Sequence, residues 1–134
     1  MKVVYVAAAA LINHDGLILL AQRPPGKSMA GLWEFPGGKI ESDETPEAAL
    51  IRELREELAI EVSENDLEPM TFASHTYQSF HLFMPLYLVR HWIGTPHPTE
   101  GQTLAWVAPQ DLHSYPAPDA DIPLFDVLAL KAEG

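Results

Sequence analysis

The chain has 134 residues, 47% of them apolar, and its 19 Asp and Glu against 8 Lys and Arg give a formal net charge of −11. This length fits one domain with a packed core, and the absence of cysteine excludes disulfides, thiolate metal sites and a cysteine nucleophile. Binding of duplex nucleic acid needs a basic face, which we do not expect on a chain this acidic. A nucleic acid polymer is therefore not an expected partner.

The acidity is concentrated in one segment. Between Glu34 and Glu68 there are 12 acidic residues and only three basic ones, Lys39, Arg52 and Arg55. The rest of the chain holds seven acidic and five basic residues and is close to neutral. Because neighbouring carboxylates repel one another, this local excess calls for a specific explanation.

The first predicted elements are two strands. Val3–Ile12 is an apolar run that begins with β-branched residues, and after a turn that ends in Asp15-Gly16 a second run covers Leu17–Gln22. This pattern is typical of a β-hairpin. The first run is ten residues long, whereas a membrane-spanning helix needs about 20. It therefore predicts a buried strand and neither a membrane anchor nor a signal peptide.

A loop and a helix follow. Residues 24–32 are expected to form a loop, and Pro36-Gly37-Gly38 indicates a sharp turn or a close approach of the backbone. Thr45 and Pro46 are typical of a helix start, and the helix is expected to end at about Leu58. Its core face consists of apolar residues at helical spacing, namely Leu50, Ile51, Leu54 and Leu58.

The second half of the chain is predicted to contain short strands and two helical segments. They are strands at Met70–Tyr77, His81–Trp92 and Leu104–Val107, a helical turn at Pro109–His113, and a helix at Ile122–Lys131. Pro85 should place part of its strand at an edge or a bulge. Because strands and helices mix without regular alternation, the order favours a mixed α/β sandwich over a doubly wound sheet.

Three carboxylates share one face of the predicted helix. Glu56 and Glu57 follow Glu53 by three and four residues. On a helix these three side chains span an arc of about 100° beside the apolar stripe. A hard divalent cation such as Mg²⁺ or Mn²⁺ takes oxygen ligands of this kind and would remove their repulsion. The alternative is a solvated charged face in which Arg52 pairs with Glu56.

The residues around this face follow a specific spacing. The order is Gly38, five residues, Glu44, seven residues, Arg52-Glu53-Leu54, Arg55 and Glu56-Glu57. This spacing resembles the Nudix box, the signature of hydrolases that cleave nucleoside diphosphates linked to another group. One position departs from the family pattern, because Ala59 stands where the family has a glycine that ends the helix in a left-handed conformation. This departure concerns the local backbone and not the metal site.

A wider resemblance, to the MutT branch of the family, covers most of the chain. The stretches that carry it are 31–41, 100–102, Trp106, 115–116 and 120–124. It implies one Nudix domain over residues 1–134 with an α+β fold, an α/β/α sandwich around a mixed β-sheet. It also implies a cytoplasmic enzyme, expected as a monomer, that hydrolyses 8-oxo-dGTP to 8-oxo-dGMP and pyrophosphate. Such an activity removes oxidised guanine nucleotides before DNA replication and so limits DNA damage.

The resemblance also implies a metal site. Its expected ligands for Mg²⁺, or Mn²⁺ in its place, are the carboxylates of Glu53, Glu56 and Glu57 and the carbonyl of Gly37 or Gly38. Glu100, in a distant Glu-Gly-Gln stretch, is expected to be a further ligand or a base. Glu53 is the first candidate for the general base, with Glu56 or Glu100 as rivals.

Two further charged residues of the box are expected to act through their neighbours. Arg52 should orient the glutamates by hydrogen bonds and not touch the substrate. Glu44 should support the loop before the helix, because Lys39 and Arg52 can both reach it.

Residues for the rest of the nucleotide are also implied. Arg23 and Lys39 are cations expected to bind phosphate oxygens, and Phe35 and Phe80 are expected to wall the base pocket. Asp121 occupies the position that reads the base, where the best-known MutT members carry Asn. Related enzymes that act on cytidine or modified pyrimidine nucleotides carry Asp there, so CTP or a modified dCTP is the alternative substrate. A catalytically silent nucleotide-binding module is the third hypothesis.

Overall fold

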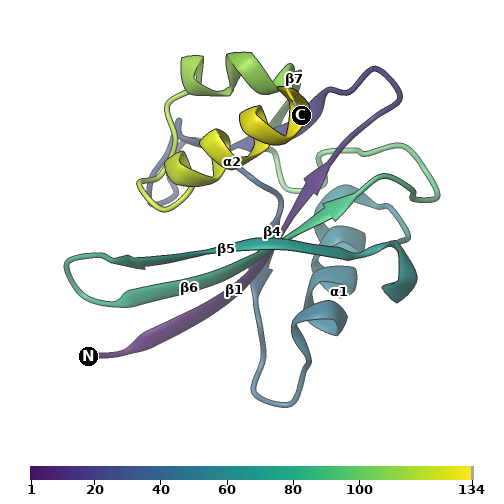
Figure 1. Cartoon of the computed structure of the whole chain (residues 1–134). Coiled ribbons are helices and arrows are strands. Elements are labelled where there is room, and N and C mark those ends of the chain that lie inside the picture. Colours follow the sequence, from purple (N-terminus) through teal and green to yellow (C-terminus); the bar gives the residue numbers. More distant parts are fainter. Residues whose placement is uncertain (134) are drawn as a thin grey trace.

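The computed structural model describes residues 1–133 and contains two β-sheets and two α-helices (Figure 1). The first sheet has the order β4-β1-β6-β5, formed by Gly37–Lys39, Val3–Leu11, His81–Val89 and Glu68–Thr76. The second has the order β3-β2-β7, formed by Trp33–Glu34, Ile18–Gln22 and Thr103–Val107. Strands β1 and β6 run parallel and the other pairs run antiparallel, so the predicted mixed sheet is confirmed.

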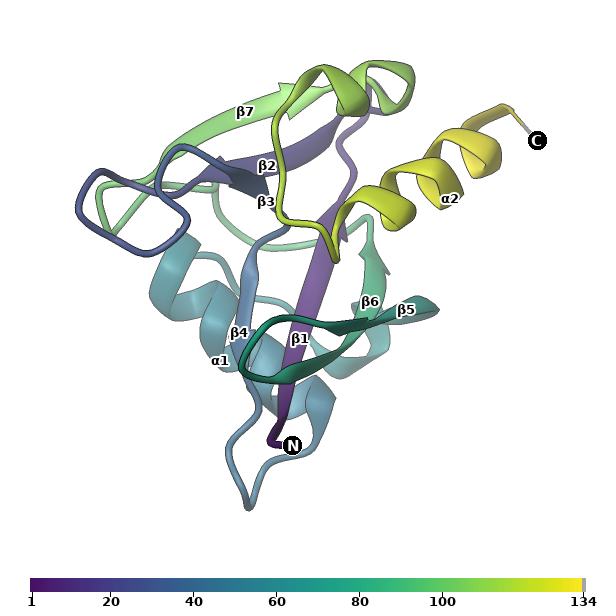
Figure 2. The same cartoon turned by 90° about the vertical axis from the view of Figure 1, so that its left-hand side faces the viewer.

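Helices cover the first sheet on its two sides. Helix α1 (Pro46–Leu58) lies against one face, and α2 (Ile122–Glu133) lies on the opposite side (Figures 1 and 2). Strand β1 separates two hydrophobic clusters, because Ala7 and Ala9 belong to the α1 cluster and Ala8 and Ala10 to the α2 cluster. The predicted α/β/α sandwich is therefore confirmed. Two short 3₁₀ helices complete the described elements, η1 (Glu64–Asp66) and η2 (Pro109–Ser114).

The predicted hairpin between the first two strands is wrong. A turn does form, and the amide of Asn13 donates to the carbonyl of Leu17 at 3.0 Å. Beyond a single bridge between Ile12 and Ile18, however, β1 and β2 belong to different sheets. The physical reason is that each strand has partners on both of its edges, β4 and β6 for β1, and β3 and β7 for β2.

The expected position of Pro85 at an edge or bulge is also wrong. Strand β6 lies inside the sheet between β1 and β5, where Pro85 stands opposite Phe72. The sheet tolerates a residue without an amide hydrogen because the β1–β6 pairing is interrupted beside it, between the Tyr5–Phe83 and Ala8–Leu86 pairs. The register shift lies instead in β5. The strand itself ends at Val89 and not at Trp92.

The two glycines before α1 form a strand and not a turn. Gly37 and Gly38 pair with Ala8 and Ala7 in β4. A Cβ on Gly37, whose φ is +154°, would collide with the carbonyl oxygen of Ala7. The close backbone approach that the sequence indicated is thus between β4 and β1, and it brings the loop before α1 against the sheet.

Helix α1 has defined caps at both ends. The side chain of Thr45 accepts a hydrogen bond from the amide of Ala48 at 3.1 Å, and Pro46 occupies the first turn. At the other end Ala59 adopts the left-handed conformation, with φ 59° and ψ 33°, and its amide donates to the carbonyl of Arg55 at 3.0 Å. The helix therefore ends as it would with glycine, but with an alanine in a strained conformation.

Among residues 1–133, no helix combines the length and the apolar character needed to cross a bilayer.

Replacement of Ala59 by glycine should stabilise the protein. Glycine relieves the left-handed strain but adds unfolded-state entropy, so the expected net gain is about 0.5–1 kcal/mol. Denaturant unfolding of Ala59→Gly measures it. Ala48→Gly, at an exposed helical position of α1, is the matched control and should lower stability by about 0.5–1 kcal/mol. Equal losses for both variants would contradict the role assigned to Ala59.

Candidate active site

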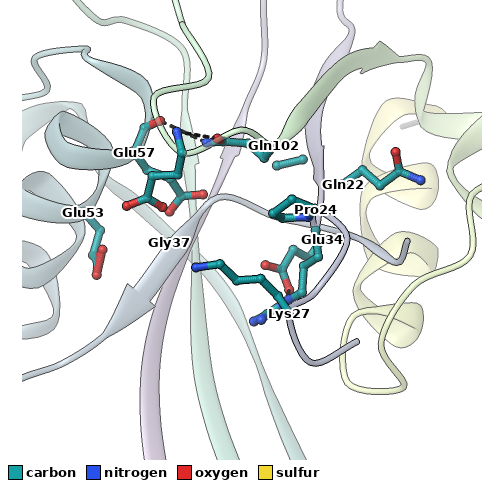
Figure 3. A pocket seen from close by; sticks show the side chains of 11 residues that line it. Gln22, Pro24, Lys27, Glu34, Gly37, Glu53, Glu57 and Gln102 are labelled. Atoms are coloured by element: carbon teal, nitrogen blue, oxygen red, sulfur yellow. Dashed lines mark hydrogen bonds and ion pairs between the residues drawn. The ribbon is translucent and has the colours of Figure 1, made fainter. Parts of the chain in front are cut away.

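A pocket of about 180 Å³ opens beside α1, between the end of β2, strand β4 and the loop before β7 (Figure 3). Charged and polar residues dominate its lining, among them Gln22, Arg23, Lys27, Glu34, Glu53, Glu57, Glu100 and Gln102. Four of these are glutamates, and they come from three separated parts of the chain. The fold thus gathers negative charge at one place, as the acidic segment of the sequence suggested.

Glu57 carries the largest pKa shift among these glutamates. Burial raises the pKa of its carboxyl to about 8, and repulsion from Glu34, Glu100 and Glu53 acts in the same direction. The pKa of Glu53 is also raised, first by burial, although Arg52 opposes the shift. In the absence of a cation, part of this cluster is therefore protonated near neutral pH.

Glu53 is held close to the backbone of β4. A Cβ on Gly38 would collide with the carboxylate of Glu53, so any larger residue there would make that side chain move. The expected proximity of Gly38 and the box glutamates is thus present in the fold.

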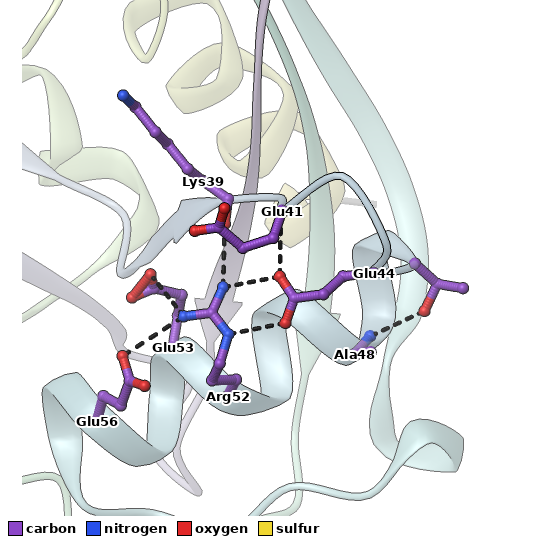
Figure 4. Close-up of polar contacts among 8 residues, drawn as sticks. Lys39, Glu41, Glu44, Ala48, Arg52, Glu53 and Glu56 are labelled. Atoms are coloured by element: carbon purple, nitrogen blue, oxygen red, sulfur yellow. Dashed lines mark hydrogen bonds and ion pairs between the residues drawn. The ribbon is translucent and has the colours of Figure 1, made fainter.

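Arg52 of α1 contacts the segment before the helix as well as the glutamates beside it on the helix (Figure 4). Its Nε and Nη2 donate to the two carboxylate oxygens of Glu44 at 2.7 and 2.8 Å, and Nη2 also donates to the carbonyl of Lys39 at 3.2 Å. The Glu44 carboxylate in turn accepts from the amide of Glu41 at 3.0 Å. These hydrogen bonds, with that from Arg52 the largest, lower the pKa of Glu44 to about 2. Glu44 is therefore a fixed anion that holds Arg52 and the preceding loop.

Glu56 does not join the other glutamates. Its carboxylate lies 3.5 Å from Nη1 of Arg52, and its side chain is 55% exposed. It is absent from the residues that line the pocket. The predicted pairing of Arg52 with Glu56 is present.

A second and larger pocket, of about 510 Å³, adjoins the first. Arg23, Glu34 and Gly37 line both pockets. The residues predicted for substrate binding all line this one, namely Arg23, Phe35, Lys39, Phe80 and Asp121. One pocket is thus rich in carboxylates and the other has more apolar walls, and they share a boundary.

The apolar walls combine aromatic rings with aliphatic side chains, among them Val6, Leu82 and Met84. Phe35 is 4% exposed and packs edge-on against Phe125 at 5.5 Å between ring centroids, so it belongs to the core as well as to the pocket. Phe80 stacks on Tyr77 at 5.1 Å. The hydroxyl of Tyr77 accepts from the amide of Ala120, which fixes the ring beside the start of α2.

Asp121 also lines this pocket and is 5% exposed. Its Oδ2 accepts from the amide of Phe35 at 3.3 Å. Burial raises the pKa of this carboxyl to about 7, with repulsion from Glu34 as the second cause. Near neutral pH the group can therefore be either a donor or only an acceptor.

The sequence patterns missed two polar residues of this region, one half-buried and one buried. Glu34 lies at the boundary of both pockets, and Arg23 Nε donates to it at 3.1 Å. Burial raises the pKa of Glu34 despite that partner. Gln102 is 8% exposed and lines the carboxylate pocket. A polar residue between Trp33 and Phe35 was the available signal for Glu34, whereas nothing local distinguished Gln102.

The donor set suits a hard divalent cation, although no preformed cluster exists. Within residues 1–133, no three His, Asp or Glu side chains stand close enough to hold one ion together. The carboxylates of Glu53, Glu57 and Glu100 nevertheless line one pocket and repel one another. Oxygen donors under mutual repulsion are the ligands that Mg²⁺ or Mn²⁺ prefers.

The chain matches the family model described as the NUDIX domain over residues 7–127. This chain belongs to the Nudix family of hydrolases. A CTP pyrophosphohydrolase of Escherichia coli K12 is 44% identical over 98% of this chain and 96% of its own length. An 8-oxo-dGTP diphosphatase of Haemophilus influenzae is 39% identical over 92% of this chain and 89% of its own length.

A solved structure gives the same family and fold. A MutT structure, from work on the proteins of Aliivibrio salmonicida and Vibrio cholerae, superimposes with a TM-score of 0.82 at 34% identity. The match covers 97% of this chain and 99% of that one. The resemblance to the MutT branch and the Nudix fold predicted for this chain are therefore confirmed.

The metal-free Nudix domain should lose stability as the pH rises. Glu57 has a folded-state pKa of about 8 against an ordinary 4.5, so the folded state binds more protons between these values. Stability is thus highest below that window and falls through it. Replacing Glu57 with glutamine should flatten this dependence and add about 1–2 kcal/mol at pH 8.

Thermal unfolding in EDTA from pH 5 to 8 checks this expectation. Glu68→Gln removes an exposed carboxylate of β5 and is the matched control. If Glu57→Gln and Glu68→Gln show the same pH dependence as the parent protein, the assigned burial and repulsion are wrong.

Proposed function

We propose that this protein is a Mg²⁺-dependent nucleoside triphosphate pyrophosphohydrolase whose preferred substrate is CTP or a related pyrimidine nucleotide. The observation that carries the proposal is the pair of adjoining pockets, one lined by Glu53, Glu57 and Glu100 and the other by aromatic rings and Asp121. A triphosphate with its cation fits the first, and a nucleoside fits the second. Hydrolysis of 8-oxo-dGTP is the second candidate, supported by the relatives that bear that name.

Glu53, Glu57 and Glu100, with the carbonyl of Gly37 or Gly38, would hold the cation. Glu56 would have to leave its contact with Arg52 to join them. Bound Mg²⁺ would supply charge neutralisation for the phosphates and lower the pKa of a water molecule.

The chain's own residues divide the remaining work. Arg23 and Lys27 present cations to phosphate oxygens at the rim of the carboxylate pocket. A carboxylate takes the proton from the attacking water while a phosphorus–oxygen bond of the triphosphate breaks, which yields a nucleoside monophosphate and pyrophosphate. Glu53 is our candidate for this base, since its carboxylate lines the pocket and burial raises its pKa although Arg52 lies 3.5 Å away. Arg52 itself orients and does not touch the substrate.

Asp121 supports the preference for cytosine. In its protonated form, a carboxyl can donate to N3 of cytosine and accept from the N4 amine at the same time. Burial raises the pKa of Asp121 to about 7, which makes this form available near neutral pH. The higher whole-length identity to the CTP pyrophosphohydrolase, 44% against 39%, supports the same choice.

Loss of the proposed base should stop catalysis without unfolding the protein. Glu53→Gln is expected to lower kcat by about 10²–10⁴-fold, the usual contribution of general base catalysis. Pyrophosphate release with Mg²⁺ measures it, and Glu64→Gln, an exposed substitution in η1, should keep full activity. Undiminished turnover by Glu53→Gln would remove Glu53 from the role of base.

The preference of the enzyme for the nucleobase of its substrate should depend on pH. We expect kcat/KM to be higher for CTP than for 8-oxo-dGTP or dGTP, and KM for CTP to rise as the pH passes about 7, where Asp121 loses its proton. In Asp121→Asn the amide is a donor and an acceptor at every pH, so this dependence should disappear.

Steady-state kinetics on the three nucleotides between pH 6 and 8.5, with product analysis, test this preference. A higher kcat/KM for 8-oxo-dGTP would transfer the proposal to the second candidate. Nucleotide binding without turnover of any substrate would support the silent binding module instead.

A further inference from the structure

The loop before β7 is fastened to the C-terminal end of α1. The last carbonyls of a helix have no partner within the helix, and here residues from that loop supply partners. The carbonyl of Leu58 accepts from the amide of His97 at 2.9 Å. The hydroxyl of Thr99 lies 2.5 Å from the carbonyl oxygen of Glu56 and 2.9 Å from that of Glu57, and the amide of Thr99 donates to the carbonyl of Glu57 at 3.2 Å.

Gln102 adds a contact of a different kind. Its Nε2 donates to the carbonyl of Glu57 at 3.0 Å, and its Oε1 accepts from the amide of Glu100 at 2.8 Å. Gln102 and Asp121 are the buried polar or charged residues among those that the structure describes. This buried position therefore requires a side chain that donates one hydrogen bond and accepts another. A carboxamide does both, whereas a carboxylate only accepts and an apolar side chain does neither.

This bridge joins the backbones of two residues whose side chains face the same pocket. The carboxylates of Glu57 and Glu100 both line it, although the two residues are more than forty positions apart. Figure 3 shows Gln102 beside Glu57 at this pocket. Thr99 fixes the loop to the helix, but only Gln102 among the contacts described links Glu57 directly to the backbone of Glu100.

We propose that Gln102 is a positioning residue that sets the placement of Glu100 relative to Glu57 and thereby the spacing of the carboxylates in the pocket. The effect of Gln102 on catalysis rests on the proposed pyrophosphohydrolase function. The effects of Gln102 on cation binding and on the loop do not depend on that function.

The test is Gln102→Met, which keeps the length of the side chain and removes both hydrogen bonds. The fold should survive, because the carbonyl of Glu57 keeps the hydrogen bond from the amide of Thr99. We expect Mn²⁺, titrated alone and followed by electron paramagnetic resonance, to bind about 10–100-fold more weakly. The amide of Glu100 should exchange its hydrogen faster, while exchange in the middle of α1 stays unchanged. Gln110→Met, an exposed substitution in η2, is the matched control.

Kinetics separate a positioning role from a general loss of stability. Gln102→Met should lower kcat and leave KM for the nucleotide nearly unchanged, since the nucleoside pocket does not include Gln102. In a Glu100→Gln background the same substitution should have little further effect on kcat, because Gln102 acts through Glu100. An equal loss in both backgrounds, or unchanged Mn²⁺ affinity and unchanged exchange at Glu100, would overturn the proposal.

The two proposals fail separately. If the unmodified protein hydrolyses no nucleotide, the proposed function is wrong, and the Mn²⁺ titration and the exchange at Glu100 still decide the role of Gln102. If the protein is active and Gln102→Met matches Gln110→Met in every measurement, only the positioning role is wrong.

Discussion

Repulsion among the carboxylates beside α1 is the constraint on which the chemistry of this fold depends. Glu57 is buried among Glu34, Glu53 and Glu100, and the pKa of its carboxyl is raised to about 8. Among the described contacts, Glu34 has a basic partner in Arg23 at 3.1 Å and Glu53 has one in Arg52 at 3.5 Å. Arg52 gives its shortest hydrogen bonds to Glu44, which lies outside the pocket lining. Negative charge therefore stays available for a cation that accompanies a polyphosphate.

Strand β1 makes this concentration of charge compatible with a packed domain. Its run of alanines is buried on both faces, so helices can cover the sheet on its two sides. Because Gly37 has no Cβ, strand β4 can approach the backbone of Ala7 closely. Because Gly37 lines both pockets, β4 is the wall shared by the region for the phosphates and the region for the nucleoside.

Local patterns predicted local features well. The N-cap of α1, its end near Leu58 and its apolar face follow from residues within one or two turns of one another. Features that depend on distant partners were less accessible. The hairpin expectation was wrong because β1 and β2 each pair with strands from elsewhere in the chain. Glu56 shares the helical arc of Glu53 in the sequence, but its exposed side chain pairs with Arg52 and is absent from the pocket lining.

The sequence by itself determined the family, the acidic helix and the residue types of the candidate site, because the Nudix spacing and the helical period are properties of neighbouring residues. Only the tertiary structure decided which carboxylates meet. Glu34, Glu57 and Glu100 are brought to one pocket by sheet pairing and by a loop fastened to a helix end. These contacts depend on backbone groups that are identical in every residue, so no local pattern of side chains reveals Gln102 as the link between Glu57 and Glu100.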